Sequence, residues 1–346
     1  MERKLTAAVL FDTNQPLQIC ELDIPKLKDG QVLVKIFYSG VCRSQLMEAR
    51  GGRGQDSWLP HLLGHEASGE VVEIGPKVNK VKIFDKVILG WIKGDGLEAE
   101  GAKYIYNDQI VNSGKVTTFS NYSIVSENRL VRIPDKIPLD LAVLFGCALL
   151  TGAGMVLNDL KPNSEMSVIV IGLGGIGLSA LMALKYLNCN KIIAIDISDE
   201  KLELAKLFGA THTFNSRDIN LFQKIKDLTI VGADACIESG GKTETIELGF
   251  ALISKKGKLI FASHPPEGEK ISIAPHELIA GKQIFGSWGG GCKPDFDIPK
   301  LAEIYLKANL PLDKLITERY NLADINRALD DLEKGNVFRP LICMNH

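Results

Sequence analysis

The sequence lacks any CxxC pair, and its cysteines are widely separated. Seven cysteines stand at positions 20, 42, 147, 189, 236, 292 and 343. An odd, scattered set argues against the disulfide framework of a small secreted domain. The first apolar run, from Leu5 to Phe11, is too short for a signal peptide. We therefore expect reduced thiols and a cytoplasmic protein.

An excess of charge of either sign is also missing. Forty basic residues face 42 acidic ones, which leaves a formal net charge of −2. A surface built for nucleic acid or anionic lipid would need clustered positive charge, so we expect neither as a partner. One uncharged stretch, residues 166–184, contains four glycines between Gly172 and Gly177. A strand, a turn and a helix explain this stretch better than a membrane span does.

The length of 346 residues suggests more than one domain. In residues 1–152, short Val- and Ile-rich runs are separated by Gly, Pro, Asn and Asp, which predicts an antiparallel barrel or sandwich. Residues 92–121 are polar with weak periodicity and are interpreted as a loop lobe. Residues 139–160 have helical spacing, with Asp140 as the candidate cap.

The pattern changes in residues 153–294. Buried apolar runs such as SVIVIG and KIIAID alternate with helical segments. This alternation predicts an α/β domain with a doubly wound parallel sheet. Residues 295–346 contain two helical stretches and a final strand, RPLICM.

The residues from Gly172 to Gly177 read Gly-Leu-Gly-Gly-Ile-Gly and match the dinucleotide fingerprint G-x-G-x-x-G. Gly172, Gly174 and Gly177 are the fixed glycines of the motif. Gly175 and Ile176 lie between the last two of them. The match follows a buried strand, opens a helix, and precedes Asp196 by 19 residues counted from Gly177. Gly172 permits the turn, Gly174 lets the backbone approach a pyrophosphate, and Gly177 allows close packing of helix and strand. Asp196 would accept hydrogen bonds from ribose hydroxyls and repel a 2′-phosphate, which favours NAD over NADP. The alternative is a glycine-rich turn that binds no cofactor.

Spacing alone does not reveal a metal site. Cys42, His65 and Cys147 are separated by 23 and 82 residues, and a single cysteine is usually a small buried apolar residue. Their surroundings are more informative: Gly-Val-Cys-Arg-Ser at 40–44, Gly-His-Glu-Ala-Ser-Gly at 64–69, and Gly-Cys at 146–147 followed by Thr151 and Gly152. With the glycine-rich loop, Asp-Lys-Val at 85–87 and Phe-Arg-Pro at 338–340, the whole chain resembles the zinc-dependent medium-chain alcohol dehydrogenase family.

The resemblance implies a fold and a reaction. A GroES-like β-barrel catalytic domain (1–152) would be followed by a Rossmann domain that binds NAD (153–294), and residues 295–346 would return to the first domain. One zinc ion would be held in the cleft between the domains by Cys42, His65 and Cys147, with a fourth position open for substrate. The zinc would activate an alcohol or carbonyl oxygen for hydride transfer to or from NAD.

Further roles follow from the resemblance alone. Ser44 would accept the alcohol proton, and Glu66 would lie behind the zinc and tune it. Arg43 and Arg339 would bind the pyrophosphate and Lys201 the adenosine ribose; Thr151 and Ser263 are the remaining cofactor contacts. Trp91 and Trp58 would form walls of the substrate pocket. The alternatives are solvated charge for the arginines and Lys201 and plain core for the tryptophans.

Three departures from the family pattern stand out. Residues 92–121 contain no cysteine, so we expect no second, structural zinc and a lobe held by packing alone. Gln45 stands where an aspartate often orients the histidine ligand. Met47 replaces a histidine that ends the proton relay in some members, so the proton would leave by water, by Glu48 or by another route.

Several questions stay open on the sequence. A zinc-free reductase of the same fold and a non-catalytic dinucleotide-binding protein are the competing interpretations. The small-molecule substrate ranges from primary and secondary alcohols to polyols, cyclitols and sugar derivatives. His61 is a candidate proton carrier, and Arg50 and Arg53 are candidate anion ligands, with ordinary loop residues as the alternative for all three. A homodimer or homotetramer would form by extending the parallel sheet at residues 283–288.

Overall fold

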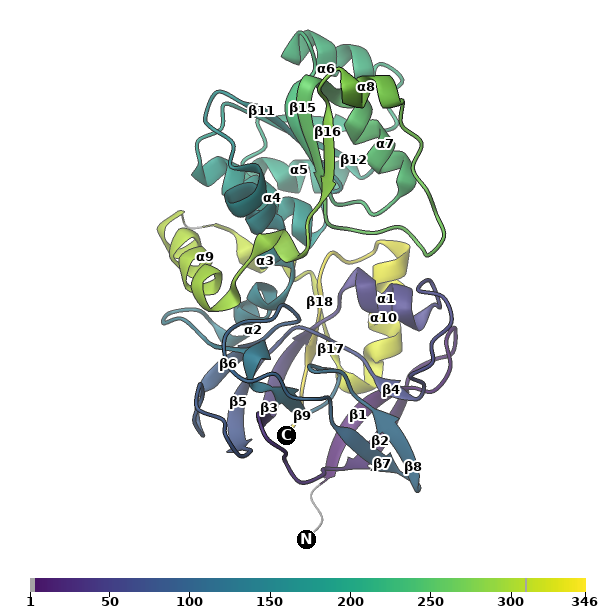
Figure 1. Cartoon of the computed structure of the whole chain (residues 1–346), viewed down its shortest axis with the longest axis vertical. Helices are drawn as coiled ribbons and strands as arrows, with labels where there is room; N and C mark the ends of the chain where they lie inside the picture. Colours follow the sequence, from purple (N-terminus) through teal and green to yellow (C-terminus); the bar gives the residue numbers. More distant parts are fainter. Residues whose placement is uncertain (1–3, 309) are drawn as a thin grey trace. The chain divides into compact units, whose positions relative to one another are not determined.

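A computed structural model describes residues 4–308 and 310–346 (Figure 1). The N-terminal strands form two mainly antiparallel sheets, in which β4–β8 and β17–β18 are the parallel pairs. One is a closed barrel in the order β1-β2-β7-β8-β4. Its strands are β1 (Lys4–Leu10), β2 (Gln18–Asp23), β4 (His61–Leu62), β7 (Lys103–Tyr106) and β8 (Gln109–Asn112). The GroES-like barrel expected from the sequence is thus present.

The second sheet contains the strands that carry the metal-site loops. Its order is β10-β6-β5-β3-β18-β17, with β9 also paired to β3. The strands are β3 (Gln31–Gly40), β5 (Ala67–Ile74), β6 (Lys86–Leu89), β9 (Tyr122–Ser126), β10 (Leu130–Arg132), β17 (Glu318–Asn321) and β18 (Pro340–Cys343). Because β18 pairs antiparallel with β3, the C-terminal residues complete a sheet begun by the N-terminal ones. The helices α1 (Arg43–Ala49), α2 (Leu139–Ala142) and α10 (Ile325–Lys334) accompany these strands.

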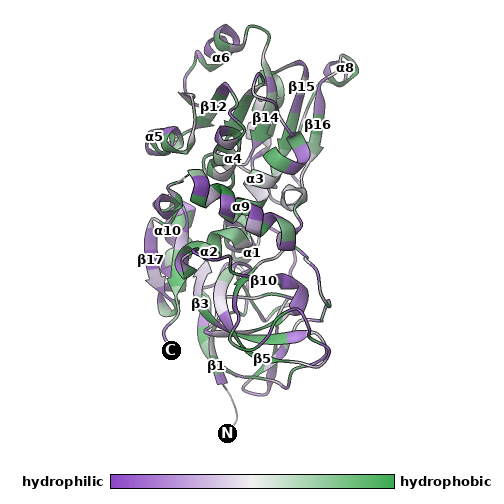
Figure 2. Cartoon of the chain, turned by 90° about the vertical axis from the view of Figure 1, so that its left-hand side faces the viewer, coloured by the Kyte–Doolittle hydropathy of each residue, from purple (hydrophilic) through white to green (hydrophobic). Residues whose placement is uncertain are grey.

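The alternating segment forms a six-stranded parallel sheet, as expected. Its order is β13-β12-β11-β14-β15-β16, and Figure 2 shows β12 and β14 largely in the hydrophobic colour. The strands are β11 (Ser167–Ile171), β12 (Lys191–Asp196), β13 (His212–Asn215), β14 (Ala233–Glu238), β15 (Ile253–Phe261) and β16 (Gln283–Gly286). The helices are α3 (Ala148–Gly154), α4 (Gly175–Tyr186), α5 (Asp199–Phe208), α6 (Leu221–Thr229), α7 (Thr243–Leu252) and α8 (Pro275–Ile279). Helix α4 contacts both α3 and α5, and α6 contacts α7, which gives two groups of helices for the two faces of the sheet.

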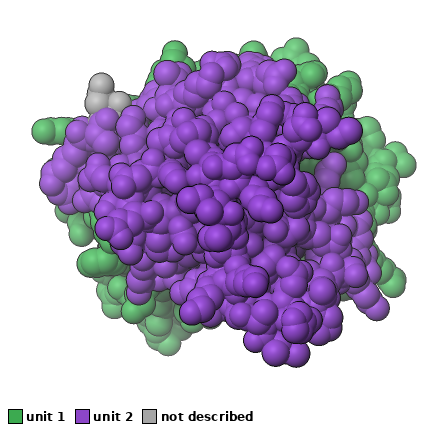
Figure 3. Space-filling view, turned by 90° about the horizontal axis from the view of Figure 1, so that it is seen from above, with its two compact units in different colours: residues 1–147, 293–302, 312–346 green, residues 148–292, 303–311 purple. Residues whose placement is uncertain are grey.

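The chain divides into two compact units, coloured separately in Figure 3. One unit comprises residues 1–147, 293–302 and 312–346, and the other 148–292 and 303–311, so α9 (Pro294–Ala308) belongs to both. The division after Cys147 lies five residues before the boundary proposed from the sequence. The reason is local: the single helix expected over 139–160 is broken, because Cys147 has non-helical angles (φ −148°, ψ −76°). Beyond α3 the chain widens into a π-helix, Met155–Leu160.

The cap of α2 differs from expectation. Pro138, not Asp140, is the N-cap of α2; the Asp140 carboxylate instead accepts the Leu141 N–H at 2.9 Å and pairs with Arg319 at 2.6 Å. Among the described residues no single helix is long and apolar enough to cross a membrane. One bent pair of helices, 139–146 with 148–160, has the length and composition of a membrane span, and those two properties alone suggest one.

The lobe at 92–121 is more ordered than its sequence suggests. It contains the hairpin β7–β8, whose two-residue turn places Asn107 and Asp108 at positive φ (47° and 63°). An Asn-Asp pair tolerates the left-handed backbone that such hairpin turns need, so the turn had a sequence signal. Strand β7 pairs with β2 and so helps to close the barrel.

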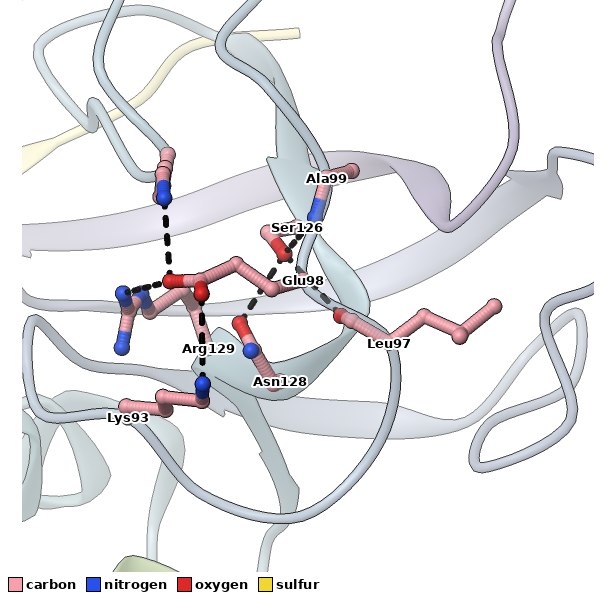
Figure 4. A network of polar contacts seen from close by, with 8 residues as sticks. Lys93, Leu97, Glu98, Ala99, Ser126, Asn128 and Arg129 are labelled. Carbon is pink, nitrogen blue, oxygen red and sulfur yellow. Dashed lines mark hydrogen bonds and ion pairs between the residues drawn. The ribbon is translucent and has the colours of Figure 1, made fainter.

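The expectation that packing alone holds this lobe is wrong. The buried Glu127 carboxylate accepts the backbone N–H groups of Asn79 (2.6 Å), Lys80 (2.5 Å) and Leu97 (2.8 Å). Nearby, Glu98 pairs with Lys93 (3.2 Å), Lys115 (3.0 Å) and Arg129 (3.1 Å), part of the network in Figure 4. Two carboxylates therefore tie the lobe to the sheet.

We expect Glu127→Gln to lower the free energy of unfolding by about 2–3 kcal/mol, because one amide oxygen cannot serve three N–H donors. Burial acts to raise the pKa of Glu127, but the backbone donors outweigh it and the pKa is lowered. A lowered folded-state pKa gives stability that is complete above the ordinary glutamate pKa of about 4.3 and is lost as pH falls through the folded-state value. Urea unfolding of both proteins from neutral to acid pH should show the difference shrinking. The control Glu98→Gln removes a solvent-exposed ion pair and should cost much less; equal losses would contradict the assignment.

Candidate metal centre and dinucleotide site

The three candidate zinc ligands come from three loops of the first unit. Cys42 precedes α1, His65 lies between β4 and β5, and Cys147 follows the 3₁₀ turn Val143–Gly146. Their ligand atoms all lie within 4.8 Å of one another, and Cys147 is buried. The structure therefore brings together residues that are far apart in the sequence.

The chemistry of this cluster fits a metal ion. His65 Nε2 is buried, and within the described residues it has no hydrogen-bond partner. The hydrogen bond from Cys147 is the largest influence on the pKa of Cys42, and with the charge of Arg339 it lowers that pKa well below the usual value despite burial. The same bond, with burial, raises the pKa of Cys147. Two converging sulfurs beside an unpartnered imidazole nitrogen are donors that zinc prefers.

Gln45 spans two of these ligands. Its Oε1 accepts the Cys42 N–H at 2.9 Å, and its Nε2 contacts His65 Nδ1. Gln45 is buried, so these contacts are shielded from water. The amide thus contacts the histidine ring without adding a charge, but it turns an N–H toward Nδ1, where an aspartate would accept a hydrogen bond.

Glu66 and Arg339 form a buried ion pair beside the ligands. Both Glu66 oxygens contact Arg339 Nη2, one at 2.5 Å, and the two side chains are 0% and 7% exposed. Burial raises the pKa of Glu66 and Arg339 opposes that rise. The resemblance implied a pyrophosphate contact for Arg339, whereas here the Arg339 guanidinium contacts the Glu66 carboxylate. Glu66 was also expected beside the zinc, but its oxygens are not among the atoms that converge with Cys42, His65 and Cys147. Gly40 makes room for the pair, since a Cβ there would lie 2.6 Å from Glu66 Oε1.

The other predicted residues of this unit are placed around the cluster. The Ser44 hydroxyl is buried and has no partner among the described residues, while Arg43 is exposed at the start of α1. The Trp91 ring lies 6.4 Å from the His65 ring, centroid to centroid. Trp58, 60% exposed, lines a cavity of about 370 Å³ that His65 and Gln45 also border.

The loop arginines have protein partners rather than free guanidinium groups. Arg50 pairs with Asp330 at 2.5 Å and with Glu333 at 3.0 Å. Arg53 pairs with Glu48 at 3.1 Å. These ion pairs favour a structural role for both arginines over binding of an anionic substrate.

The glycine-rich loop of the second unit joins β11 to α4, and its three glycines are constrained differently. Gly172 has φ 84°, and a Cβ there would lie 2.6 Å from Gly240 N. A Cβ on Gly177 would lie 2.0 Å from Gly172 O, but one on Gly174 would contact nothing within 4 Å. Gly172 and Gly177 are therefore needed for packing, whereas Gly174 keeps a space open. That space lies at the end of β11, where the strand order reverses toward β14, the usual position of a bound dinucleotide.

Asp196 ends β12 next to this loop. Its Oδ2 accepts the Leu173 N–H at 2.7 Å and its Oδ1 accepts the Ser198 N–H at 3.0 Å. Each oxygen keeps a lone pair for a ribose hydroxyl. Of the other predicted cofactor residues, Thr151 is buried in α3 and the Lys201 N–H bonds the Ser198 hydroxyl at 3.4 Å.

Two residues of this site were not predicted from the sequence. Ser239 donates its hydroxyl to Gly172 O at 2.6 Å and its own carbonyl accepts from Ser263 at 3.2 Å. The buried Glu238 accepts the Gly240 N–H at 2.7 Å and the Gly241 N–H at 3.0 Å. The signal was present: polar residues and a Gly-Gly pair directly follow a buried strand.

We expect Glu66→Met to lower the free energy of unfolding by about 3–5 kcal/mol, because Arg339 would keep an uncompensated buried charge. The double variant Glu66→Met/Arg339→Met should be more stable than the single one, since it removes both charges. Urea unfolding of zinc-free protein measures both changes without a contribution from the metal. If the loss of stability in the double variant equals the sum of the losses in Glu66→Met and Arg339→Met, the two residues act independently.

Comparison with known proteins identifies the family of the chain. Residues 28–135 match the alcohol dehydrogenase GroES-like domain, and residues 175–305 match the zinc-binding dehydrogenase domain. The chain is 32% identical to the S-(hydroxymethyl)glutathione dehydrogenase of Synechocystis sp., covering 98% of this chain and 99% of that protein. It is 31% identical to alcohol dehydrogenase class-3 of Drosophila melanogaster, over 97% and 96% of the two chains.

A solved structure is similar over its full length. The benzyl alcohol dehydrogenase of Acinetobacter calcoaceticus superposes with a TM-score of 0.90 at 30% identity, over 99% of this chain and 100% of that one. The two domain matches and the full-length similarity lead to one conclusion: the chain belongs to the zinc-dependent medium-chain alcohol dehydrogenase family and is an oxidoreductase.

Proposed function

We propose that the protein oxidises a compact or flat alcohol with NAD, or reduces the matching carbonyl, using one zinc ion held by Cys42, His65 and Cys147. The observation that carries the proposal is the convergence of these three donors around an unpartnered, buried His65 Nε2. Zinc bound there supplies a positive charge that makes the alcohol or carbonyl oxygen reactive. We propose no four-cysteine structural zinc, since residues 92–121 contain no cysteine.

The chain's own residues supply the remaining steps. The buried Ser44 hydroxyl has no partner among the described residues and so is free to accept the alcohol proton. Met47 cannot carry a proton and Glu48 is paired with Arg53, so neither side chain would take the proton on from Ser44. Gly174, Gly175 and Ile176 present backbone N–H groups at the start of α4 to the pyrophosphate. Asp196 selects NAD by repelling a 2′-phosphate.

The substrate class rests on the cavity and on the relatives. Leu62, Leu63, Val116 and Trp58 give the cavity an apolar side, which suits a compact or aromatic alcohol. Benzyl alcohol and S-(hydroxymethyl)glutathione are named for the similar proteins, and both belong in a test panel. We also propose a cytoplasmic homo-oligomer in which β16, the edge strand of the parallel sheet, pairs with its copy.

Activity is tested by following NAD reduction over a panel of primary, secondary, aromatic and polyhydric alcohols, with NADP in parallel. Cys147→Ser should lower kcat/KM by at least ~10²-fold, because the metal contributes several kcal/mol to the barrier. The control Cys343→Ser, a partly exposed cysteine away from the cluster, should keep zinc and activity. Turnover without bound zinc would favour a zinc-free reductase. Zinc and NAD binding with no turnover on any substrate would favour a non-catalytic protein.

The cofactor site is tested by two alanine variants of one loop. Gly174→Ala places a methyl group in open space, so the thermal midpoint of unfolding should not change. The affinity for NAD should fall by about tenfold or more, because the methyl group would keep the pyrophosphate from the backbone. Gly177→Ala forces a contact with Gly172 O and should destabilise the fold itself. Calorimetric titration with NAD, alongside thermal unfolding, separates the two effects. Unchanged NAD affinity in Gly174→Ala would place the cofactor elsewhere.

A further inference from the structure

The first unit contains a second cluster of converging donor atoms that the proposed reaction does not use. Glu48 lies near the end of α1, Asp56 in the following loop, and His61 at the start of β4. Their ligand atoms all lie within 4.8 Å of one another. His61 is only 6% exposed, and all three residues line the cavity of about 370 Å³.

The hydrogen bonds of His61 fix which nitrogen faces the cluster. Its Nδ1 lies 3.1 Å from the Leu62 carbonyl oxygen, which can only accept, so Nδ1 carries a hydrogen. Its Nε2 then faces Asp56 Oδ2 at 2.8 Å and Glu48 Oε1 at 3.9 Å. Both of these are acceptor oxygens. A metal ion between the three atoms would bind the Nε2 lone pair and balance the charge of the two carboxylates.

Each carboxylate is also held by its other oxygen. Asp56 Oδ1 accepts the Trp58 N–H at 2.9 Å, and Glu48 Oε2 pairs with Arg53 Nη1 at 3.1 Å. Every donor group thus uses one heteroatom to bind protein and turns the other toward a common centre. Metal ligands are oriented in this way, with the second nitrogen of a histidine commonly bonded to a backbone carbonyl.

We propose that Glu48, Asp56 and His61 form a second zinc site, separate from the cysteine-containing cluster. The ligands would be Glu48 Oε1, Asp56 Oδ2 and His61 Nε2, with a water from the cavity in the fourth position. Zinc bonds of about 2.0–2.2 Å place tetrahedral ligand atoms roughly 3.3 Å apart, and the observed 2.8 and 3.9 Å lie on either side of that value. One imidazole and two carboxylates hold zinc without thiolates.

Binding at this site has a defined proton balance. Zinc would bind the lone pair of His61 Nε2, so any proton on that nitrogen is released to solvent, and no bond to carbon or sulfur changes. The ion would then join α1, the loop at 50–60 and β4 of the same unit.

The test is a metal titration of the full-length protein. Metal-free protein is loaded with zinc, passed through gel filtration, and its zinc content is measured. We expect roughly two zinc ions per chain in the wild type and roughly one in His61→Gln, Asp56→Asn and Glu48→Gln, because each loses one of only three protein ligands. Cys147→Ser should also bind roughly one. The matched control Asp108→Asn, on the exposed hairpin turn, should still bind two.

Cobalt(II) identifies which site each ion occupies. The first cobalt should give the intense sulfur-to-metal absorption of the thiolate cluster, and the second only weak bands from nitrogen and oxygen ligands. His61→Gln should keep the first signal, which also shows that the variant is folded; if it does not fold, Asp56→Asn and Glu48→Gln give the same comparison. One zinc ion in the wild type would overturn the proposal. Two ions in all three cluster variants would overturn it as well.

Discussion

The buried ion pair between Glu66 and Arg339 is the contact on which the metal site depends most. Glu66 follows the ligand His65, and Arg339 precedes β18, 273 residues later in the chain. A charge buried this deeply must be matched, so the loop that carries His65 is complete only when the C-terminal strand is in place. The same arginine, by its charge, helps to lower the pKa of Cys42. One pair therefore couples the closing of the fold to the electrostatics of the ligands.

The two units divide the chemistry between them. The three candidate zinc ligands, Ser44, Trp58 and Trp91 belong to the first unit, whereas the glycine-rich loop and Asp196 belong to the second. Within each unit the functional residues lie on loops at the ends of strands, where a rigid sheet sets their positions. The sheet that contains β3 and β5 carries the candidate metal cluster, and the parallel sheet carries the glycine-rich loop.

Local patterns predicted the elements well, and long-range polar contacts escaped prediction. The buried strands and the glycine-rich loop have signals within a few residues, so both were predicted, and the three zinc ligands were identified through their neighbouring motifs. The Asn107–Asp108 turn had a signal that was overlooked. In contrast, nothing near Glu127 or Arg339 in the sequence shows that each binds groups many residues away. The His61 cluster escaped for the same reason, since its members become neighbours only in the folded unit.

The carboxylate contacts of the lobe have a consequence for how the protein fails. A four-cysteine metal site would make this segment vulnerable to oxidants and chelators. Here Glu98 holds the segment through an ion pair with Lys115, and Glu127 holds it through backbone N–H groups. An oxidant that destroys the Cys42–Cys147 pair would therefore stop the chemistry and leave the barrel intact. The inactive protein would persist in the cell as a folded molecule that still has its NAD loop, rather than as an unfolded chain ready for proteolysis.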